Sequence, residues 1–183
     1  MRVLGIDPAL VSTGYCVIDA MRGKFTLVAE GLIKTTPAMP MNDRLRTIFH
    51  AVSHLAHTLK PDRAAVEETY VNANARSSVL LAQARATAIC GVFAAGDIPV
   101  TSITPTQIKK QMTGNGSSDK SLVAIAVRRL IPELIGARHD VTDAAAVALY
   151  EAMNAGLLQR IKGIPTGARS VELVKGRIIP ARR

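Results

Sequence analysis

The first 34 residues contain three runs of strand-forming residues that are separated by short turns. The runs are MRVLGID, TGYCVID and KFTLVAEGLI, and the breaks fall at Asp7-Pro8 and Arg22-Gly23. Val, Ile and Tyr favour strands, whereas Asp-Pro and Gly mark turns. Strands joined by so few residues pair antiparallel, because a parallel connection needs a crossover of a dozen or more residues. The sequence therefore predicts an antiparallel meander at the start of the chain.

Helices and strands alternate after this meander. Apolar residues recur at helical spacing from Met41 to Leu59, and Thr104-Pro105 is a typical helix start. We predict helices over 41–59, 76–95, 105–112, 119–130 and 141–155, and strands over 64–71 and 98–103. Hairpins followed by strand–helix crossovers are typical of a mixed sheet flanked by helices. The predicted fold class is α/β, with a mixed five-stranded sheet in which antiparallel hairpins come first and parallel crossovers follow.

Positive charge is concentrated at the C-terminal end of the chain. The sequence carries 23 Lys and Arg against 14 Asp and Glu, a formal net charge of +9. Seven of the basic residues and one acid lie after Ala155, so residues 1–155 have a net charge of only +3. A basic excess favours a polyanionic partner, nucleic acid first. We predict one globular domain over 1–155 and a basic, flexible extension over 156–183.

The composition indicates an intracellular globular protein. No apolar run approaches the roughly 20 residues of a membrane span, and the N-terminal residues do not match a secretory signal. Cys16 and Cys90 lie in apolar surroundings, so we expect buried, reduced thiols rather than a disulfide. The predicted location is cytoplasmic, with no membrane partner.

Acidic residues occur at three places in the predicted elements. Asp7 ends the first strand, and Glu67 and Glu68 interrupt an apolar strand in which neighbouring side chains point to opposite faces. At most one of these two glutamates can therefore meet Asp7. Asp140 and Asp143 are three residues apart at a helix start, so both lie on one helical face. Each acid alone also fits a structural role in a turn, on a solvated edge or at a helix cap.

Four of these carboxylates together have the chemistry of a divalent-metal site. Mg²⁺ and Mn²⁺ prefer oxygen ligands, whereas Zn²⁺ prefers nitrogen and sulfur. In a basic protein such a cluster suits phosphodiester hydrolysis, because two metals about 3.5–4 Å apart can activate water and stabilise the leaving oxygen. The candidate metal ligands and catalytic residues are therefore Asp7, Asp140, Asp143 and one member of the pair Glu67 and Glu68.

The four histidines are candidates for further ligands. His50, His54 and His57 fall opposite the apolar stripe of their helix, so they are expected to form a solvated face rather than a zinc site. His139 adjoins Asp140 and fits three roles, as a proton shuttle, an alternative ligand or a plain loop residue.

A Gly/Ser loop over 114–118 is flanked by lysines. Lys109, Lys110 and Lys120 lie on either side of it, and glycine-loop amides with nearby lysines can hold phosphates. The loop lacks the Gly-Lys-Ser/Thr ending of a nucleotide-binding phosphate loop, so nucleotide hydrolysis is not indicated. Tyr70, just beyond the Glu67 strand, fits stacking on a base and core packing equally well.

Four segments together resemble the bacterial Holliday-junction resolvases of the RuvC family. They are LGIDPALVSTGY, AAVEETYVNANARSSVLLAQARATA, TPTQIKKQMTGNGSSDKSLV and DVTDAAAVAL, and they run in this order through about residues 3–155. The resemblance implies a ribonuclease-H-like fold, a homodimer, and Mg²⁺-dependent nicking of two symmetrically placed strands of a four-way DNA junction in recombination and repair. It also implies two metal ions per site, with Mn²⁺ as a plausible substitute, and contact with the branch-migration motor RuvAB.

The resemblance also assigns roles by position. Asp7 matches the first-strand metal ligand, Glu67 the strand glutamate, and Asp140 and Asp143 the closing pair of acids. The family usually reads Asp-Pro-Gly where this chain has Asp7-Pro8-Ala9, and some members use histidine as one of the last two ligands.

The DNA-binding roles follow in the same way. Lys109 and Lys120 match lysines that approach the DNA near the scissile phosphate, and Tyr70 matches an aromatic residue that meets bases at the crossover. Three other functions fit parts of the pattern. They are a non-catalytic junction-binding protein, a related ribonuclease-H-like nuclease acting on RNA, and an actin-like ATPase, for which the chain is too short.

Overall fold

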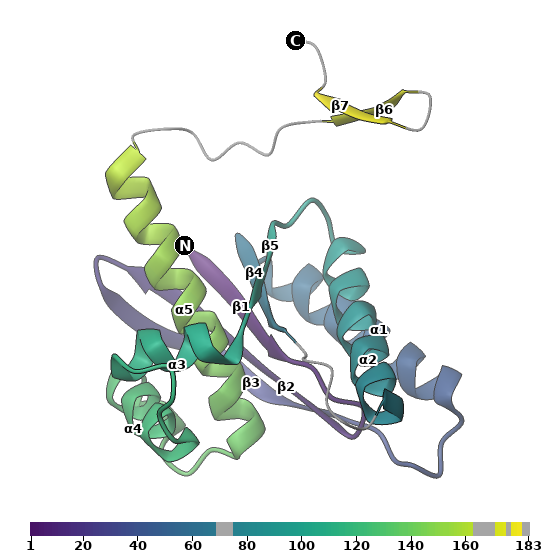
Figure 1. The fold of residues 1–183 in the computed structure, drawn as a ribbon, viewed down its shortest axis with the longest axis horizontal. Coiled ribbons are helices and arrows are strands. Elements are labelled where there is room, and N and C mark those ends of the chain that lie inside the picture. Colours follow the sequence, from purple (N-terminus) through teal and green to yellow (C-terminus); the bar gives the residue numbers. More distant parts are fainter. Residues whose placement is uncertain (69–74, 163–170, 175–176, 181–183) are drawn as a thin grey trace.

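A five-stranded sheet between two layers of helices forms the body of the computed structural model (Figure 1). Residues 1–68, 75–162, 171–174 and 177–180 are described, with side chains over 1–68 and 75–156. The elements in chain order are β1 (Arg2–Asp7), β2 (Ser12–Met21), β3 (Lys24–Lys34), α1 (Met41–Leu59), β4 (Arg63–Glu67), α2 (Ala75–Phe93), β5 (Val100–Ile103), α3 (Pro105–Thr113), α4 (Lys120–Leu130), the short 3-10 helix η1 (Pro132–Leu134), α5 (His139–Lys162), β6 (Val171–Val174) and β7 (Arg177–Pro180).

The sheet has the predicted mixed topology. Its strand order is β3-β2-β1-β4-β5, with β1–β2 and β2–β3 antiparallel and β1–β4 and β4–β5 parallel. The turn between β2 and β3 has positive φ at both Arg22 and Gly23, which is the backbone of the tight turn that suits a twisted hairpin. β6 and β7 pair antiparallel in a separate two-stranded sheet. The expected α/β class and the meander followed by crossovers are both confirmed.

Side chains alternate between the two faces of the sheet and build two separate cores. Leu4 and Ile6 of β1 pack in a cluster with α1 and α2, whereas Val3 packs in a cluster with α5. A Cβ added at Gly5 would lie 2.2 Å from the carbonyl oxygen of Ala144, so only glycine lets α5 lie this close to β1. This contact brings the first turn of α5 to the end of the sheet where β1 and β4 finish.

Three expectations about local structure were wrong. The strand predicted over 64–71 ends at Glu67, and the helix predicted to end at Ala155 continues to Lys162. A single Gly156 does not end this helix, since glycine costs only about 1 kcal/mol in a helix interior and good helix formers follow it. Cys90 is exposed instead of buried, because Gly91 takes the position against α1, where a Cβ would lie 2.9 Å from the carbonyl oxygen of Phe49.

Other expectations were confirmed. Cys16 is a buried free thiol, and burial raises its pKa to about 12. His50, His54 and His57 are exposed on α1, as the pattern predicted for a solvated face. Within the described parts of the chain, the helices fall short of the length and apolarity that a membrane span requires.

Candidate active site

Two acids end neighbouring parallel strands on the same face of the sheet. Asp7 is the last residue of β1, and Glu67 is the last residue of β4. Val3 and Ala65, at even spacing from these acids, pack in the core cluster under α5. Because side chains alternate along a strand, Asp7 and Glu67 point toward α5, whereas Glu68 falls on the opposite phase. The carboxyl ends of parallel strands are where open α/β sheets bind ligands.

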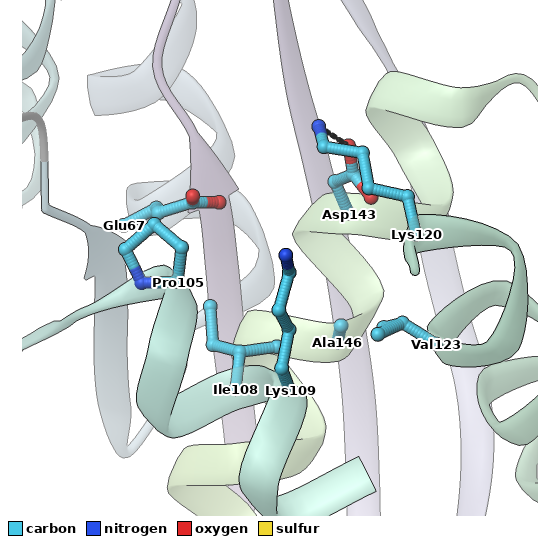
Figure 2. Close-up of a pocket in the computed structure, with 8 residues that line it drawn as sticks. All are labelled: Glu67, Pro105, Ile108, Lys109, Lys120, Val123, Asp143 and Ala146. Carbon is cyan, nitrogen blue, oxygen red and sulfur yellow. Dashed lines mark hydrogen bonds and ion pairs between the residues drawn. The ribbon is translucent and has the colours of Figure 1, made fainter. Parts of the chain in front are cut away.

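The first turn of α5 brings two further acids to this end of the sheet. The Ser12 hydroxyl donates a hydrogen bond to Oδ2 of Asp140 at 2.6 Å. Lys120 Nζ lies 3.2 Å from Oδ2 of Asp143, whose side chain is 23% exposed (Figure 2). Asp140 is therefore held by a neutral donor, and Asp143 is paired with a cation.

Burial and mutual repulsion keep two of the acids protonated to unusually high pH. Burial, followed by the charges of Glu67 and Asp143, raises the pKa of Asp7 from 3.8 to about 7. Burial and the charge of Asp143 also raise the pKa of Glu67, from 4.5 to about 7. Lys120 opposes both shifts without cancelling them. The site is therefore short of positive charge, a condition that favours a bound cation.

Capping residues determine where the helices that carry the lysines begin. Thr104 accepts a hydrogen bond from the backbone N–H of Gln107, whose side chain in turn accepts from the Thr104 N–H. This capping box starts α3 one turn before Lys109. Asp119 accepts from the Ser121 N–H at 2.7 Å and starts α4 at Lys120. The motifs TPTQ and SDKS therefore place both lysines beside the acids.

A pocket opens between α3, α4 and the first turns of α5 (Figure 2). Charged side chains and an apolar wall share its lining, which consists of Glu67, Asp143, Lys109, Lys120, Pro105, Ile108, Val123 and Ala146. The apolar wall lowers the local dielectric and strengthens interactions between the charged groups. Lys110, next to Lys109 in the chain, is exposed and does not line this pocket.

The acids fit a divalent cation in chemistry, although their side chains do not converge on one point. In the described residues no group of three or more His, Cys, Asp or Glu side chains is close enough to hold a metal ion. Asp7, Glu67, Asp140 and Asp143 nevertheless offer only hard oxygen donors, and Asp7 and Glu67 repel each other in a buried setting. Hard oxygen donors of this kind are what Mg²⁺ and Mn²⁺ prefer.

The structure brings most of the sequence-predicted residues to one place. Asp7, Glu67 and Asp143 interact electrostatically with one another and with Lys120; Asp140 also acts on Asp7, and Lys109 acts on Glu67. The remaining predicted residues are Asp140, at the β2 side of the site, His139, exposed as the first residue of α5, and Tyr70, which lies outside the described residues.

Two contacts of the site were not predicted from the sequence. Ser12 binds Asp140, and the signal for it was available, because strand alternation puts Ser12 on the same face as Gly14 and Cys16. Arg85 of α2 donates from Nε to the carbonyl oxygen of Glu67 at 3.2 Å and steadies the end of β4. No sequence pattern links Arg85 to that strand.

Sequence comparisons agree on one family. The family model described as crossover junction endodeoxyribonuclease RuvC matches residues 3–151. RuvC of Burkholderia vietnamiensis is 40% identical over 181 residues, which are 98% of this chain and 99% of that protein. RuvC of Cupriavidus metallidurans is 36% identical with the same coverage of both chains.

Solved structures agree with the sequence comparisons. Thermus thermophilus RuvC matches with a TM-score of 0.76 at 28% identity, over 86% of this chain and 96% of that chain. The same protein in complex with a Holliday junction substrate matches with a TM-score of 0.77 at 28% identity and the same coverage. Yeast mitochondrial Ydc2, a Holliday junction resolvase, shares the fold at 16% identity and a TM-score of 0.64, over 88% of this chain and 83% of that chain.

The mixed sheet with α5 across one face defines a nuclease of the ribonuclease-H-like class. Within that class, the chain belongs to the RuvC family of crossover junction endodeoxyribonucleases.

Proposed function

We propose that this protein resolves Holliday junctions, nicking two symmetrically placed strands of a four-way DNA junction in homologous recombination and DNA repair. The observation that carries the proposal is the meeting of Asp7, Glu67 and Asp143 with two lysines at one end of the sheet. Family membership supports it, and T. thermophilus RuvC has been solved with a Holliday junction substrate. The proposal includes action in the cytoplasm and contact with the branch-migration motor RuvAB.

The proposed cofactor is Mg²⁺, with Mn²⁺ as a substitute and two ions in each site. The residues that would hold it are Asp7, Glu67, Asp140 and Asp143. When bound, such ions activate the attacking water and stabilise the leaving oxygen. The buried carboxylates of Asp7 and Glu67 would be deprotonated on loading, because a cation lowers the raised pKa of both groups.

The lysines of the pocket are the proposed phosphate ligands. Both lysines line the pocket, with Lys120 beside Asp143 and the end of Lys109 between Glu67 and Lys120 (Figure 2). Their ammonium groups bind the scissile phosphate and stabilise the negative charge that develops on it during in-line attack by water. Lys120 exchanges its contact with Asp143 for one with the phosphate. The products are 5′-phosphate and 3′-hydroxyl ends, and Tyr70 stacks on a base at the crossover.

The proposed functional unit is a homodimer, because paired nicking needs two active sites. An apolar stripe on the exposed face of α2 supports this, since residues three or four apart along a helix share one side. The stripe consists of Val79, Ala82, Ala86, Cys90 and Phe93, all of them exposed. A second copy of the same helix is the partner that a symmetric dimer would place against this stripe.

The proposed domain division keeps the nuclease in residues 1–155 and leaves residues 156–183 as a basic extension. The family model ends at residue 151, close to this division. Six units of the net positive charge lie in the extension, so its role is to add affinity for DNA of any sequence. Removal of residues 163–183 is expected to weaken junction binding and its salt dependence, with the nicking rate of bound junctions unchanged.

The test of the proposed activity is the cleavage of a synthetic four-way junction by the full chain in Mg²⁺. We expect paired nicks at symmetric positions, no cleavage of linear duplex made from the same arms, and no cleavage in EDTA. Asp7→Asn is expected to bind the junction and to nick it about 10²–10³-fold more slowly.

Two outcomes would overturn the proposal in different ways. Salt-sensitive junction binding without nicking, indifferent to Mg²⁺ and to Asp7→Asn, would identify a non-catalytic junction-binding protein. Faster cleavage of RNA than of the junction, in direct competition, would identify a ribonuclease instead.

A further inference from the structure

A hydrogen bond joins the first residue of β2 to the first turn of α5. Ser12 Oγ donates to Oδ2 of Asp140 at 2.6 Å, across 128 positions of the chain. An oxygen–oxygen distance of 2.6 Å lies at the short end of the range for O–H···O hydrogen bonds. We propose that Ser12 is a positioning residue of the metal site, which orients the Asp140 carboxylate for a divalent cation. The inference rests on the proposed function, since it takes Asp140 as a metal ligand.

The backbone on both sides of Ser12 is held in place. Thr13 Oγ1 donates to the carbonyl oxygen of Ala9 and accepts from the Ala9 N–H at 3.2 Å, which closes the loop between β1 and β2. On the other side, the Thr35 N–H donates to the carbonyl oxygen of Val11 at 3.1 Å. Ser12 itself is paired with Lys34 in the β2–β3 ladder. The hydroxyl therefore extends from a fixed point, which is what a group that orients a ligand needs.

The same strand also holds the backbone of Asp140. A Cβ added at Gly14 would lie 2.1 Å from the Asp140 carbonyl oxygen, so the start of α5 lies directly on β2. Ser12 and Gly14 are on one face of β2, because they are two residues apart. Gly14 thus permits the backbone of α5 to lie close to β2, and Ser12 binds the Asp140 side chain at this point.

The two acids of α5 differ in the charge of their partners. Asp143 is paired with the ammonium group of Lys120, which competes with a cation for the same oxygen. The Ser12 hydroxyl is neutral, so it restricts the rotation of Asp140 without cancelling its negative charge. Asp140 is therefore the acid of this pair that is oriented without a competing cation on the same carboxylate.

The experiment measures metal affinity directly, apart from cleavage. Mn²⁺ binding to the full chain is followed by calorimetry, and the Mg²⁺ concentration for half-maximal junction nicking is measured in parallel. Loss of the group that orients a metal ligand typically weakens affinity about 10–100-fold. We expect Ser12→Ala to weaken Mn²⁺ binding about 10-fold and to raise the half-maximal Mg²⁺ by a similar factor. The nicking rate at saturating Mg²⁺ is expected to stay within about 2-fold of the wild type.

Two further variants separate positioning from a structural role. Ser12→Thr keeps the hydroxyl in a residue that suits a strand, and we expect it to restore the affinity for Mn²⁺. Ser53→Ala, on α1 at the other face of the sheet, is the matched control and is expected to bind Mn²⁺ like the wild type. Urea unfolding of the metal-free variants reports any loss of stability, which a purely structural contact would cause without a change in affinity.

The outcomes separate this inference from the proposed function. If the wild-type protein nicks the junction and Ser12→Ala binds Mn²⁺ with the same affinity as the wild type, the positioning role is overturned and the proposed function stays intact. A loss of affinity that Ser12→Thr does not restore would also overturn it. Absence of both Mn²⁺ binding and nicking in the wild type would overturn the proposed function itself.

Discussion

Asp7 and Glu67 lie in a site where burial opposes their ionisation. Between the ordinary pKa of these carboxyls and the raised values of about 7, the folded chain binds more protons than the unfolded chain does. The free energy of unfolding of the metal-free protein therefore increases as the pH falls from about 8 to 5, and stops increasing below the ordinary values near 4. The residues that suit a metal ion thus destabilise the fold at neutral pH when no metal is bound.

Asp7→Asn is expected to stabilise the metal-free protein at pH 8. The amide removes a buried charge, and we expect the free energy of unfolding to rise by about 1–2 kcal/mol, with the gain largely lost at pH 5. Urea unfolding in EDTA at several pH values measures both effects. A variant that is less stable than the wild type at pH 8 would contradict this view of the site.

Lys109 and Lys110 are adjacent lysines with different surroundings. Lys109 lines the pocket and acts on Glu67, whereas Lys110 is exposed outside it. We expect Lys109→Ala to slow nicking about 100-fold at saturating protein and Mg²⁺, because it removes a cation that is proposed to bind the reacting phosphate. Lys110→Ala is expected to change the rate less than about 3-fold. Equal losses in single-turnover assays would show that only the general positive charge matters.

At the scale of elements, the position of α5 on the sheet depends on close contact with glycines of the strands. We expect Gly5→Ala to lower the free energy of unfolding by about 3 kcal/mol or more, because the new Cβ would meet backbone atoms of Ala144 and Ala148. Gly156→Ala, in the same helix, meets nothing within 4 Å and is expected to stabilise by about 0.5–1 kcal/mol. Thermal and urea unfolding compare the two variants. A similar effect of both would rule out the close approach at Gly5.

Local sequence signals predicted helix bounds well where residues of the same segment determine them. The bounds of α1 match the apolar periodicity, and α3 begins at Pro105 because Thr104 caps it. The end of α5 was missed, since one glycine is a weak stop signal. The end of β4 at Glu67 was missed as well, because residues that favour strands continue beyond it and the ladder to β5 ends there.

The site was predictable only in part, because some of its contacts join segments that are far apart in the sequence. Strand alternation allowed only one of Glu67 and Glu68 to meet Asp7, and the family resemblance selected Glu67. Helical spacing kept Asp140 and Asp143 on one face. Alternation along β2 places Ser12 on the face toward α5 but does not identify its partner Asp140. The contact of Arg85 with Glu67 depends on distant segments packing together, so no local pattern carries it.

At the scale of the whole molecule, the two faces of the sheet have different uses. The face under α5 carries the candidate site, and the other is covered by α1 and α2 (Figure 1). The exposed stripe on α2 includes Phe93, which is 54% exposed. Dimerisation through α2 would therefore leave the acids of each protomer accessible to DNA.

Phe93→Glu is expected to convert the proposed dimer into monomers at micromolar concentration. A charge placed in an apolar interface lacks a partner there, whereas the isolated chain keeps its two cores. Sedimentation velocity measures the change, and junction assays should show single nicks in place of paired ones. A matched change at an exposed position of α1, Asn42→Glu, is expected to leave the dimer intact. An unchanged dimer in Phe93→Glu would place the interface elsewhere.

Where α5 lies nearest to β1 at Gly5, the contact is made by residues that have no side-chain rotamers. Ala144 and Ala148 meet Gly5, so at this point helix and strand touch through backbone and methyl groups. A contact between longer side chains can lengthen or shorten when they change rotamer, and this one has no such freedom. The distance from the acids of α5 to those of the strands is consequently fixed. The lysines near these acids, in contrast, have long side chains that can change rotamer. In the proposed reaction, the lysines can therefore adjust to the phosphate while the spacing between the acids stays fixed.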